Sequence, residues 1–135
     1  MTAKQWLNRA RNVDREIDVL IKAKERERDR LLSITANITG ETVSRTKDPH
    51  RMDNYAALVE MLDAKTDELY AVKTEVAAAI SKLTDRRHRE VLYGRYILCR
   101  TWEQIAVDMS YSYMQVTRLH GAALDAIKDV IECYT

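Results

Sequence analysis

The chain has 135 residues, the size of one ordinary domain. Three Gly, one Pro and no Phe, with 32% charged residues, speak against a sheet protein with many tight turns. The 22 basic and 21 acidic side chains leave a net charge of +1, which predicts neither a histone-like partner nor a membrane surface. Because strong helix formers dominate, the composition predicts an all-α protein.

Targeting signals and cysteine clusters are both missing from the sequence. No early apolar run is long enough for a signal peptide, and no stretch approaches the roughly 18 apolar residues of a membrane span. We therefore expect a cytoplasmic protein. Cys99 and Cys133 are isolated, without a CxxC pair or clustered histidines, which disfavours a disulfide scaffold and a zinc site. We expect neither a metal nor a cofactor.

Residues 1–83 are expected to form a helical arm, and its first helix begins at a capping box of Thr2 and Gln5. Apolar residues then recur at alternating steps of three and four, the spacing of a coiled-coil seam, and predict a helix up to about Thr35. Residues 37–48 contain Gly40 and many short polar side chains, and are predicted to form a loop. The seam positions are Trp6, Ala10, Val13, Ile17, Leu20, Leu31, Ile34 and Ile38.

The second helix of the arm is expected to start at Asp48–Pro49, a favoured cap and first position. Two helices of similar length joined by one loop predict an antiparallel, coiled-coil-like hairpin. A lone hairpin buries little surface, so the C-terminal part or a second copy should cover its open face, and a homodimer through the arm is one hypothesis. The second seam is Met52, Tyr55, Val59, Leu62, Thr66, Leu69, Lys73, Val76, Ile80 and Leu83.

Residues 84–135 are expected to form a helix-turn-helix domain. Thr84 is predicted to cap a helix from Arg86 to Cys99. Two further capping boxes, at 101–104 and 112–115, open a short and a long helix separated by a three-residue turn, as in a helix-turn-helix. The side chains predicted to face inward are Val91, Leu92, Tyr96, Ile105, Ala106, Met109, Val116, Leu119, Ala123, Leu124 and Ile127.

Several motifs of this part carry a resemblance. The stretch Arg89–Tyr96 (REVLYGRY), Thr101–Ala106, and then Met109, Ser112, Val116 and Ala123–Leu124 resemble the fourth conserved region of bacterial sigma factors. The whole chain is also similar to small phage and prophage proteins of uncharacterised function, which pair a helical hairpin with a sigma-like terminus. The resemblance implies DNA binding in transcription control. Nothing resembles the sigma region that melts promoter DNA.

A recognition helix enters the major groove by its N-terminal turns, so the outward residues after Ser112 are predicted to contact bases. Arg118 suits guanine O6 and N7, and Gln115 suits adenine N6 and N7. The predicted base contacts are Tyr113, Met114, Gln115, Thr117 and Arg118. The phosphate contacts expected from flanking basic residues and helix starts are Arg86, Arg87, Arg89, Arg95, Arg100, Thr101, Trp102 and Ser112.

Most of these assignments have a structural alternative. Gln115 can serve only to close the capping box, and Tyr113 can pack on the preceding helix. Trp102 can shield the core, and the arginines at 86–89 can be an ordinary solvated helix face. Only Arg118 lacks an obvious structural role.

An enzyme is not expected, because the sequence has no Gly-rich phosphate loop and no Cys-His or Ser-His pair at motif spacing. The main hypothesis is a sequence-specific DNA-binding regulator of transcription, of phage or prophage origin. One alternative is a protein-interaction module that binds RNA polymerase or a phage partner without reading DNA. The other is recognition of packaging-site DNA, as in small terminase subunits.

Overall fold

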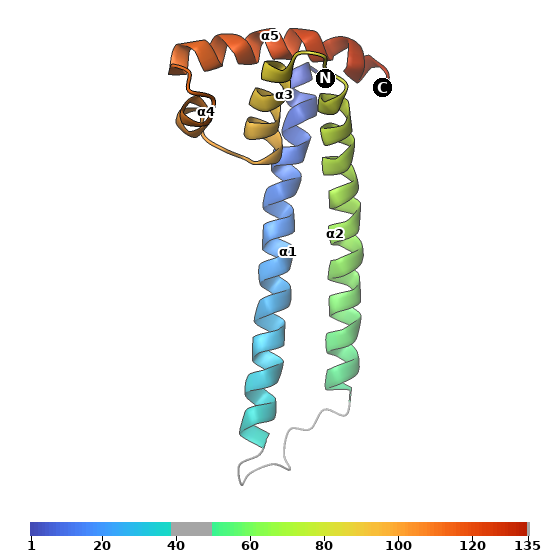
Figure 1. Ribbon diagram of the computed structural model, residues 1–135. Helices are drawn as coiled ribbons and strands as arrows, with labels where there is room; N and C mark the ends of the chain where they lie inside the picture. Colours follow the sequence, from blue (N-terminus) through green and yellow to red (C-terminus); the bar gives the residue numbers. More distant parts are fainter. Residues whose placement is uncertain (39–49, 135) are drawn as a thin grey trace. The chain divides into compact units, whose positions relative to one another are not determined.

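The part of the chain that the structure describes is built of helices (Figure 1). The computed structural model describes residues 1–38 and 50–134, and all their side chains except those of residues 34–38. The elements in chain order are α1 (Ala3–Ile38), α2 (Arg51–Ser81), α3 (Arg86–Leu92), the π-helical η1 (Tyr93–Ile97), α4 (Trp102–Met109) and α5 (Tyr113–Glu132). The prediction of an all-α fold is confirmed. Within these described ranges, no helix is long and apolar enough to cross a membrane.

The start of α1 is the capping box read from the sequence. The N–H of Thr2 donates to Oε1 of Gln5 at 2.9 Å, and the N–H of Gln5 donates to Oγ1 of Thr2 at 3.2 Å. The helix runs on through Ile38, past the end expected near Thr35, because the first strong helix breaker after it is Gly40. Residues 37 and 38 are therefore helical, which corrects the predicted loop. The rest of that loop, and the start predicted at 48–49, lie outside the described residues.

The chain divides into two compact units. One consists of residues 1–14 and 70–135, and the other of residues 15–69. This division differs from the domain boundary expected between residues 83 and 84. The reason is that the first turns of α1 and the last turns of α2 share one core with the C-terminal helices.

In the described part of residues 15–69, α1 and α2 run antiparallel as a hairpin (Figure 1). Nζ of Lys24 lies 3.0 Å from Oδ1 of Asp63, while Leu20, earlier on α1, borders the same hollow as Lys65, later on α2. Residues further along α1 therefore lie beside residues that come earlier on α2. Among the side chains described in this unit, the buried apolar ones are Ile17, Leu62 and Leu69.

Met52 departs from the predicted seam, because its side chain is 62% exposed. At this end of the hairpin, Arg51, Tyr55 and Leu58 of α2 border a hollow together with Leu31 of α1. The side of α2 that faces α1 therefore passes through Arg51 and Tyr55, which turns the intervening Met52 toward solvent.

The other unit has a continuous apolar core in which α5 packs on both α3 and α4 (Figure 1). Most side chains predicted to face inward are buried, and Met109, Leu119 and Leu124 are half-buried against the core. The prediction of the inward stripes is thereby confirmed. The core residues are Trp6, Leu7, Ala10, Val76, Ala79, Ile80, Leu83, Val91, Leu92, Tyr96, Ile105, Ala106, Val116, Ala123, Ile127 and Ile131.

The cap of α3 is Asp85 and not Thr84 as predicted. The Asp85 carboxylate accepts a hydrogen bond from the N–H of Arg87 at 2.9 Å. Both Asp and Thr are good N-cap residues. Because Thr84 and Asp85 are adjacent, the packing of the segment before α3 decides which of them caps the helix.

The helix predicted to continue to Cys99 changes its winding at Tyr93. The N–H of Leu98 donates to the Tyr93 carbonyl five residues back, at 2.9 Å, which is the π-helical pattern. Gly94 lies in this wider turn, where a Cβ would come within 3.2 Å of Cγ1 of Ile105. The missing side chain at Gly94 thus lets α4 pack closely. The helical segment ends with η1, before Cys99, which has a φ of 55°.

Candidate nucleic-acid interface

Two capped helices, α4 and α5, meet at a tight turn of three residues. Oγ1 of Thr101 accepts a hydrogen bond from the N–H of Gln104 at 3.2 Å, and Oγ of Ser112 accepts one from the N–H of Gln115 at 3.2 Å. The reverse bonds, from the cap N–H groups to the glutamine side chains, are also present. Both predicted capping boxes are confirmed. Thr101 and Ser112 are exposed, and each hydroxyl keeps its own proton to donate.

The turn depends on an unusual backbone conformation at Ser110. This residue has φ 59° and ψ 37°, which is the left-handed region that side chains other than glycine rarely adopt. The following N–H, of Tyr111, donates back to the carbonyl of Ala106 at 3.0 Å. The left-handed residue therefore ends α4 and sends the chain into the cap of α5.

The first two turns of α5 carry the five predicted base contacts. Tyr113 is 52% exposed and Met114 is 61% exposed, although both are large side chains. Gln115 and Arg118 are also exposed, whereas Thr117 is half-buried and its hydroxyl donates to the Met114 carbonyl at 2.9 Å. Four of the five side chains thus stand open to solvent, and Thr117 is partly used by the helix itself.

Gln115 closes the capping box, the structural role considered for it as an alternative to base contact. Its Oε1 accepts a hydrogen bond from the N–H of Ser112 at 2.8 Å. Bidentate recognition of adenine needs this oxygen as well as the amide nitrogen. While the box is closed, the side-chain NH₂ group of Gln115 is the part left to donate to a base.

Arg118 is exposed and has neither a hydrogen bond nor an ion pair with any residue in the described part of the chain. Its helix neighbour Val116 is fully buried, so Arg118 stands on the outer face of a helix whose inner face is fixed. An unengaged guanidinium keeps all five of its donors for a ligand.

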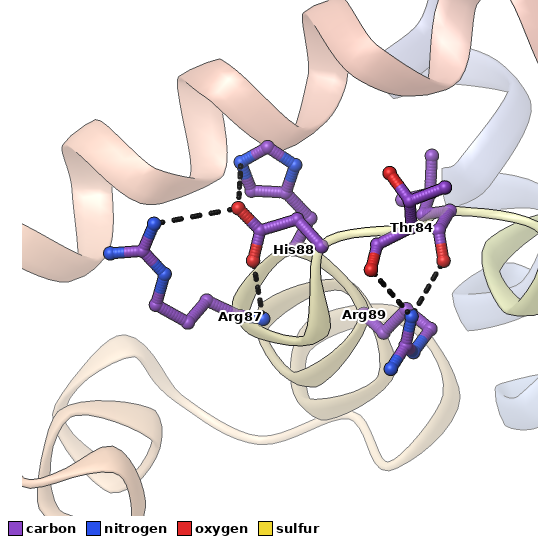
Figure 2. Close-up of polar contacts among 6 residues, drawn as sticks. Thr84, Arg87, His88 and Arg89 are labelled. Carbon is purple, nitrogen blue, oxygen red and sulfur yellow. Dashed lines mark hydrogen bonds and ion pairs between the residues drawn. The ribbon is translucent and has the colours of Figure 1, made fainter.

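The first turn of α3 is organised around the carboxylate of Asp85. Figure 2 shows Arg87 and His88 turned toward this group, with Arg87 Nη2 at 3.4 Å and His88 Nε2 at 3.7 Å. The hydrogen bond from the backbone N–H of Arg87 is the main reason why the pKa of Asp85 is lowered. Arg87 thus has a partner within its own turn, while much of its side chain remains in solvent.

Arg89 and Arg86 differ in how far they are free to meet a phosphate. Nη1 of Arg89 donates to the carbonyls of Leu83 at 2.6 Å and Thr84 at 3.2 Å (Figure 2). These bonds hold Arg89 against the chain that follows α2. Nε of Arg86 donates to Glu90 at 2.8 Å, yet the Arg86 side chain is 82% exposed.

Arg95, Arg100 and Trp102 meet at the start of α4. The guanidinium carbon of Arg95 lies 4.4 Å from the centre of the Trp102 ring, and Nη1 donates to the Arg100 carbonyl at 3.2 Å. The Arg100 side chain pairs with Asp108. Trp102 is half-buried and packs edge-on to His120 with ring centres 4.6 Å apart, so its indole covers the core.

His120 is a buried polar residue that the sequence reading left without a specific place. Its side chain is 8% exposed, and Nε2 lies 2.8 Å from the Tyr96 hydroxyl. The helical spacing could have predicted this burial, because His120 falls on the same inward stripe of α5 as Val116 and Ala123. The hydrogen bond to Tyr96 satisfies the buried imidazole.

Burial, together with the positive charges of Lys4 and Arg95, lowers the pKa of His120 to about 4. The imidazole is therefore neutral at neutral pH. This state suits a packing role beneath the helix-turn-helix.

No group of three or more metal-ligating side chains occurs among the described residues. Cys99 and Cys133 are free thiols, and burial is the main cause that raises the pKa of Cys99.

No protein-family model matches the chain, and no curated protein or solved structure matches it either. The geometry of the helix-turn-helix and the side chains that it exposes are therefore the basis for assigning a function.

Proposed function

We propose that the protein is a sequence-specific DNA-binding regulator of transcription that reads the major groove with the start of α5. In this proposal it is encoded by a phage or prophage and acts in the cytoplasm of the bacterial host. The resemblance of residues 84–127 to the fourth sigma region supports the proposal, as does the arrangement of α4, turn and α5.

The observation that carries the proposal is the exposed start of α5. Tyr113 and Met114 are more than half exposed, and Arg118 stands on the same helix without a partner in the described chain. The opposite face of α5 is buried from Val116 onward. Met114 and Arg118 lie one turn apart on the outer face of α5, where a thioether and a free guanidinium match the thymine methyl group and the guanine edge of the major groove.

The proposal is tested by selecting duplexes from a random library with the purified protein and measuring affinities for the selected motif by fluorescence anisotropy. We expect one motif to be enriched. Arg118→Ala should weaken binding to it by about 1–3 kcal/mol and relax the preference at one base pair.

Lys128→Ala is the matched control, because Lys128 is an exposed cation further along α5 whose partner is Asp125 at 3.0 Å. This variant should retain both the affinity and the motif. If no motif is enriched, or if Arg118→Ala behaves like Lys128→Ala, the proposal fails. The position of the motif in the source genome, at a promoter or at a packaging origin, separates transcription control from packaging.

Binding to a protein such as RNA polymerase is the second candidate, and one observation favours it. Leu98 is 59% exposed and Val107 is 79% exposed, and both border a hollow that also contains the Arg100–Asp108 ion pair. Exposed apolar side chains around a hollow suit a protein partner. If Val107→Glu abolishes co-purification with polymerase, and the wild type selects no duplex, this candidate replaces DNA reading.

The proposal includes a homodimer through residues 15–69. Val19 is 64% exposed and borders an apolar hollow with Lys65, and Met61, one turn before Lys65, is 61% exposed. Residues 22–30 carry five basic and three acidic side chains, whereas residues 51–69 carry two basic and five acidic ones. A second copy can thus cover the apolar face and set the basic helix of each hairpin against the acidic helix of the other.

A further inference from the structure

The N-terminal turns of α1 bring basic residues beside the helix-turn-helix. Oδ2 of Asp14 lies 3.6 Å from Sγ of Cys99, so α1 passes along the residues that follow η1. Arg11 stands one turn before Asp14. Burial, and then the neighbouring guanidinium of Arg11, lower the pKa of Arg95, which places these two cations in each other's field.

No acidic side chain in the described chain neutralises Arg11. The carboxylate of Asp14 is taken by Lys73, at 2.6 Å. Arg11 forms no ion pair with a described residue, and its Nε is buried without a hydrogen-bond partner among them. A buried N–H without an acceptor and a cation facing a like charge both cost stability, so the arrangement is unfavourable unless an anion joins it.

These cations border the starts of both helices of the motif. Arg95 covers the ring of Trp102, the first residue of α4, and lies near Tyr113, the first residue of α5. The exposed Lys4 acts in the same way on His120, in the middle of the same face of α5. Lys4 also has no ion pair with any residue that the structure describes.

We infer that Lys4, Arg11 and Arg95 bind phosphates of the DNA backbone beside the groove that α5 reads. The inference rests on the proposed function, because only a duplex seated on α5 brings a row of phosphates to this place. Guanidinium groups offer paired donors to phosphate oxygens, and Lys4 adds a point charge.

The contribution of α1 adds a second basic segment to the interface. Residues 4 and 11 lie more than eighty positions before Arg95, so a motif confined to residues 84–127 does not include them. The fold joins the two segments through the shared core of Leu7, Ala10 and Leu92.

The test uses the full-length protein, the selected duplex and a duplex of unrelated sequence, titrated by fluorescence anisotropy over a range of salt concentrations. Arg11→Gln should weaken binding to both duplexes by about fivefold near 0.15 M salt and reduce the salt slope by about 0.9. The ratio of the two affinities should not change. Lys4→Gln, at an exposed position that folding tolerates, should behave in the same way.

Lys128→Gln is the matched control, because it removes a positive charge from an exposed position near the far end of α5, outside both proposed interfaces. It should leave both affinities unchanged. A thermal melt adds a readout that separates binding from packing, since Arg11→Gln should not lower the melting temperature if the guanidinium is kept for a ligand.

The outcomes distinguish this inference from the proposed function. If the wild type selects and binds a motif but Arg11→Gln and Lys4→Gln match Lys128→Gln, the phosphate site is wrong and the reading by α5 stands. If Arg11→Gln changes the preferred bases instead of the salt slope, the site is also wrong. If the wild type binds no duplex at all, both are wrong.

Discussion

His120 is the residue whose charge state matters most for the folded chain. It is buried against Tyr96 and Trp102, and its pKa is about 4, compared with 6.5 for an unperturbed histidine. The unfolded chain therefore binds a proton first as the pH falls. The contribution of neutral His120 to the free energy of unfolding is complete above pH 6.5, declines between pH 6.5 and 4, and is lost below pH 4. This contribution is at most about 3 kcal/mol.

Urea denaturation at a series of pH values measures this contribution. His120→Phe serves as the reference, because it fills the same space and cannot titrate. Carboxylates titrate in both proteins, so the difference between the two pH curves isolates His120. Parallel curves between pH 4 and 6.5 would show that His120 is not the source of the effect.

At the residue scale, the sequence predicted what depends on near neighbours. The capping boxes at Thr2, Thr101 and Ser112 need only a partner three residues away, and all three are present. The role of Arg89 was missed because its acceptors are backbone carbonyls that become available only where α2 ends. The place of Arg11 was missed for a similar reason, since it depends on how α1 packs beside η1.

The turn between α4 and α5 offers a test at the scale of the element. Ser110 has a left-handed backbone, which costs side chains other than glycine about 1–2 kcal/mol. Ser110→Gly should remove this cost. The greater conformational freedom of glycine in the unfolded chain offsets part of the gain, so the stability should rise by about 0.5–1 kcal/mol. Thermal denaturation followed by circular dichroism measures the change.

Ser33→Gly is the control for this substitution, because Ser33 is exposed within α1, where glycine only weakens the helix. It should lower the stability by about 0.5 kcal/mol. A melting temperature lowered by Ser110→Gly would mean that the turn does not hold the left-handed conformation.

Helix periodicity predicted every α-helix, but it did not predict the change to π winding at Tyr93. The apolar stripe continues through Leu92 and Tyr96 whether the helix is α or π, so spacing alone does not separate the two. The close approach of Ile105 to Gly94 is a tertiary contact between two elements. The sequence shows that a glycine is present there, but not what packs on it.

At the scale of the whole molecule, the division into two compact units has no counterpart in the sequence pattern. The seam of α1 passes through Val13 and Ile17 without a break, although the first belongs to one unit and the second to the other. Periodicity reports which face of a helix is buried and not which partner covers it. That choice is made by the C-terminal helices, which share one core with the first turns of α1 and the last turns of α2.

The homodimer is also a prediction for the whole molecule. Sedimentation equilibrium should show a dimer at micromolar concentration. Val19→Glu and Met61→Glu should shift the protein toward a monomer without unfolding it, because both positions are exposed in the single chain. Leu32→Glu is the control, since Leu32 is 54% exposed but lies roughly 140° around α1 from Val19. A monomeric wild type, or a dimer that only Leu32→Glu disrupts, would contradict this interface.

An NMR titration of the ¹⁵N-labelled protein with its selected duplex shows whether the start of α5 meets the bases. We expect the largest shifts of backbone amide signals at residues 101–104 and 112–118, at the starts of α4 and α5. Saturation of the protein with duplex while these signals stay in place would contradict it.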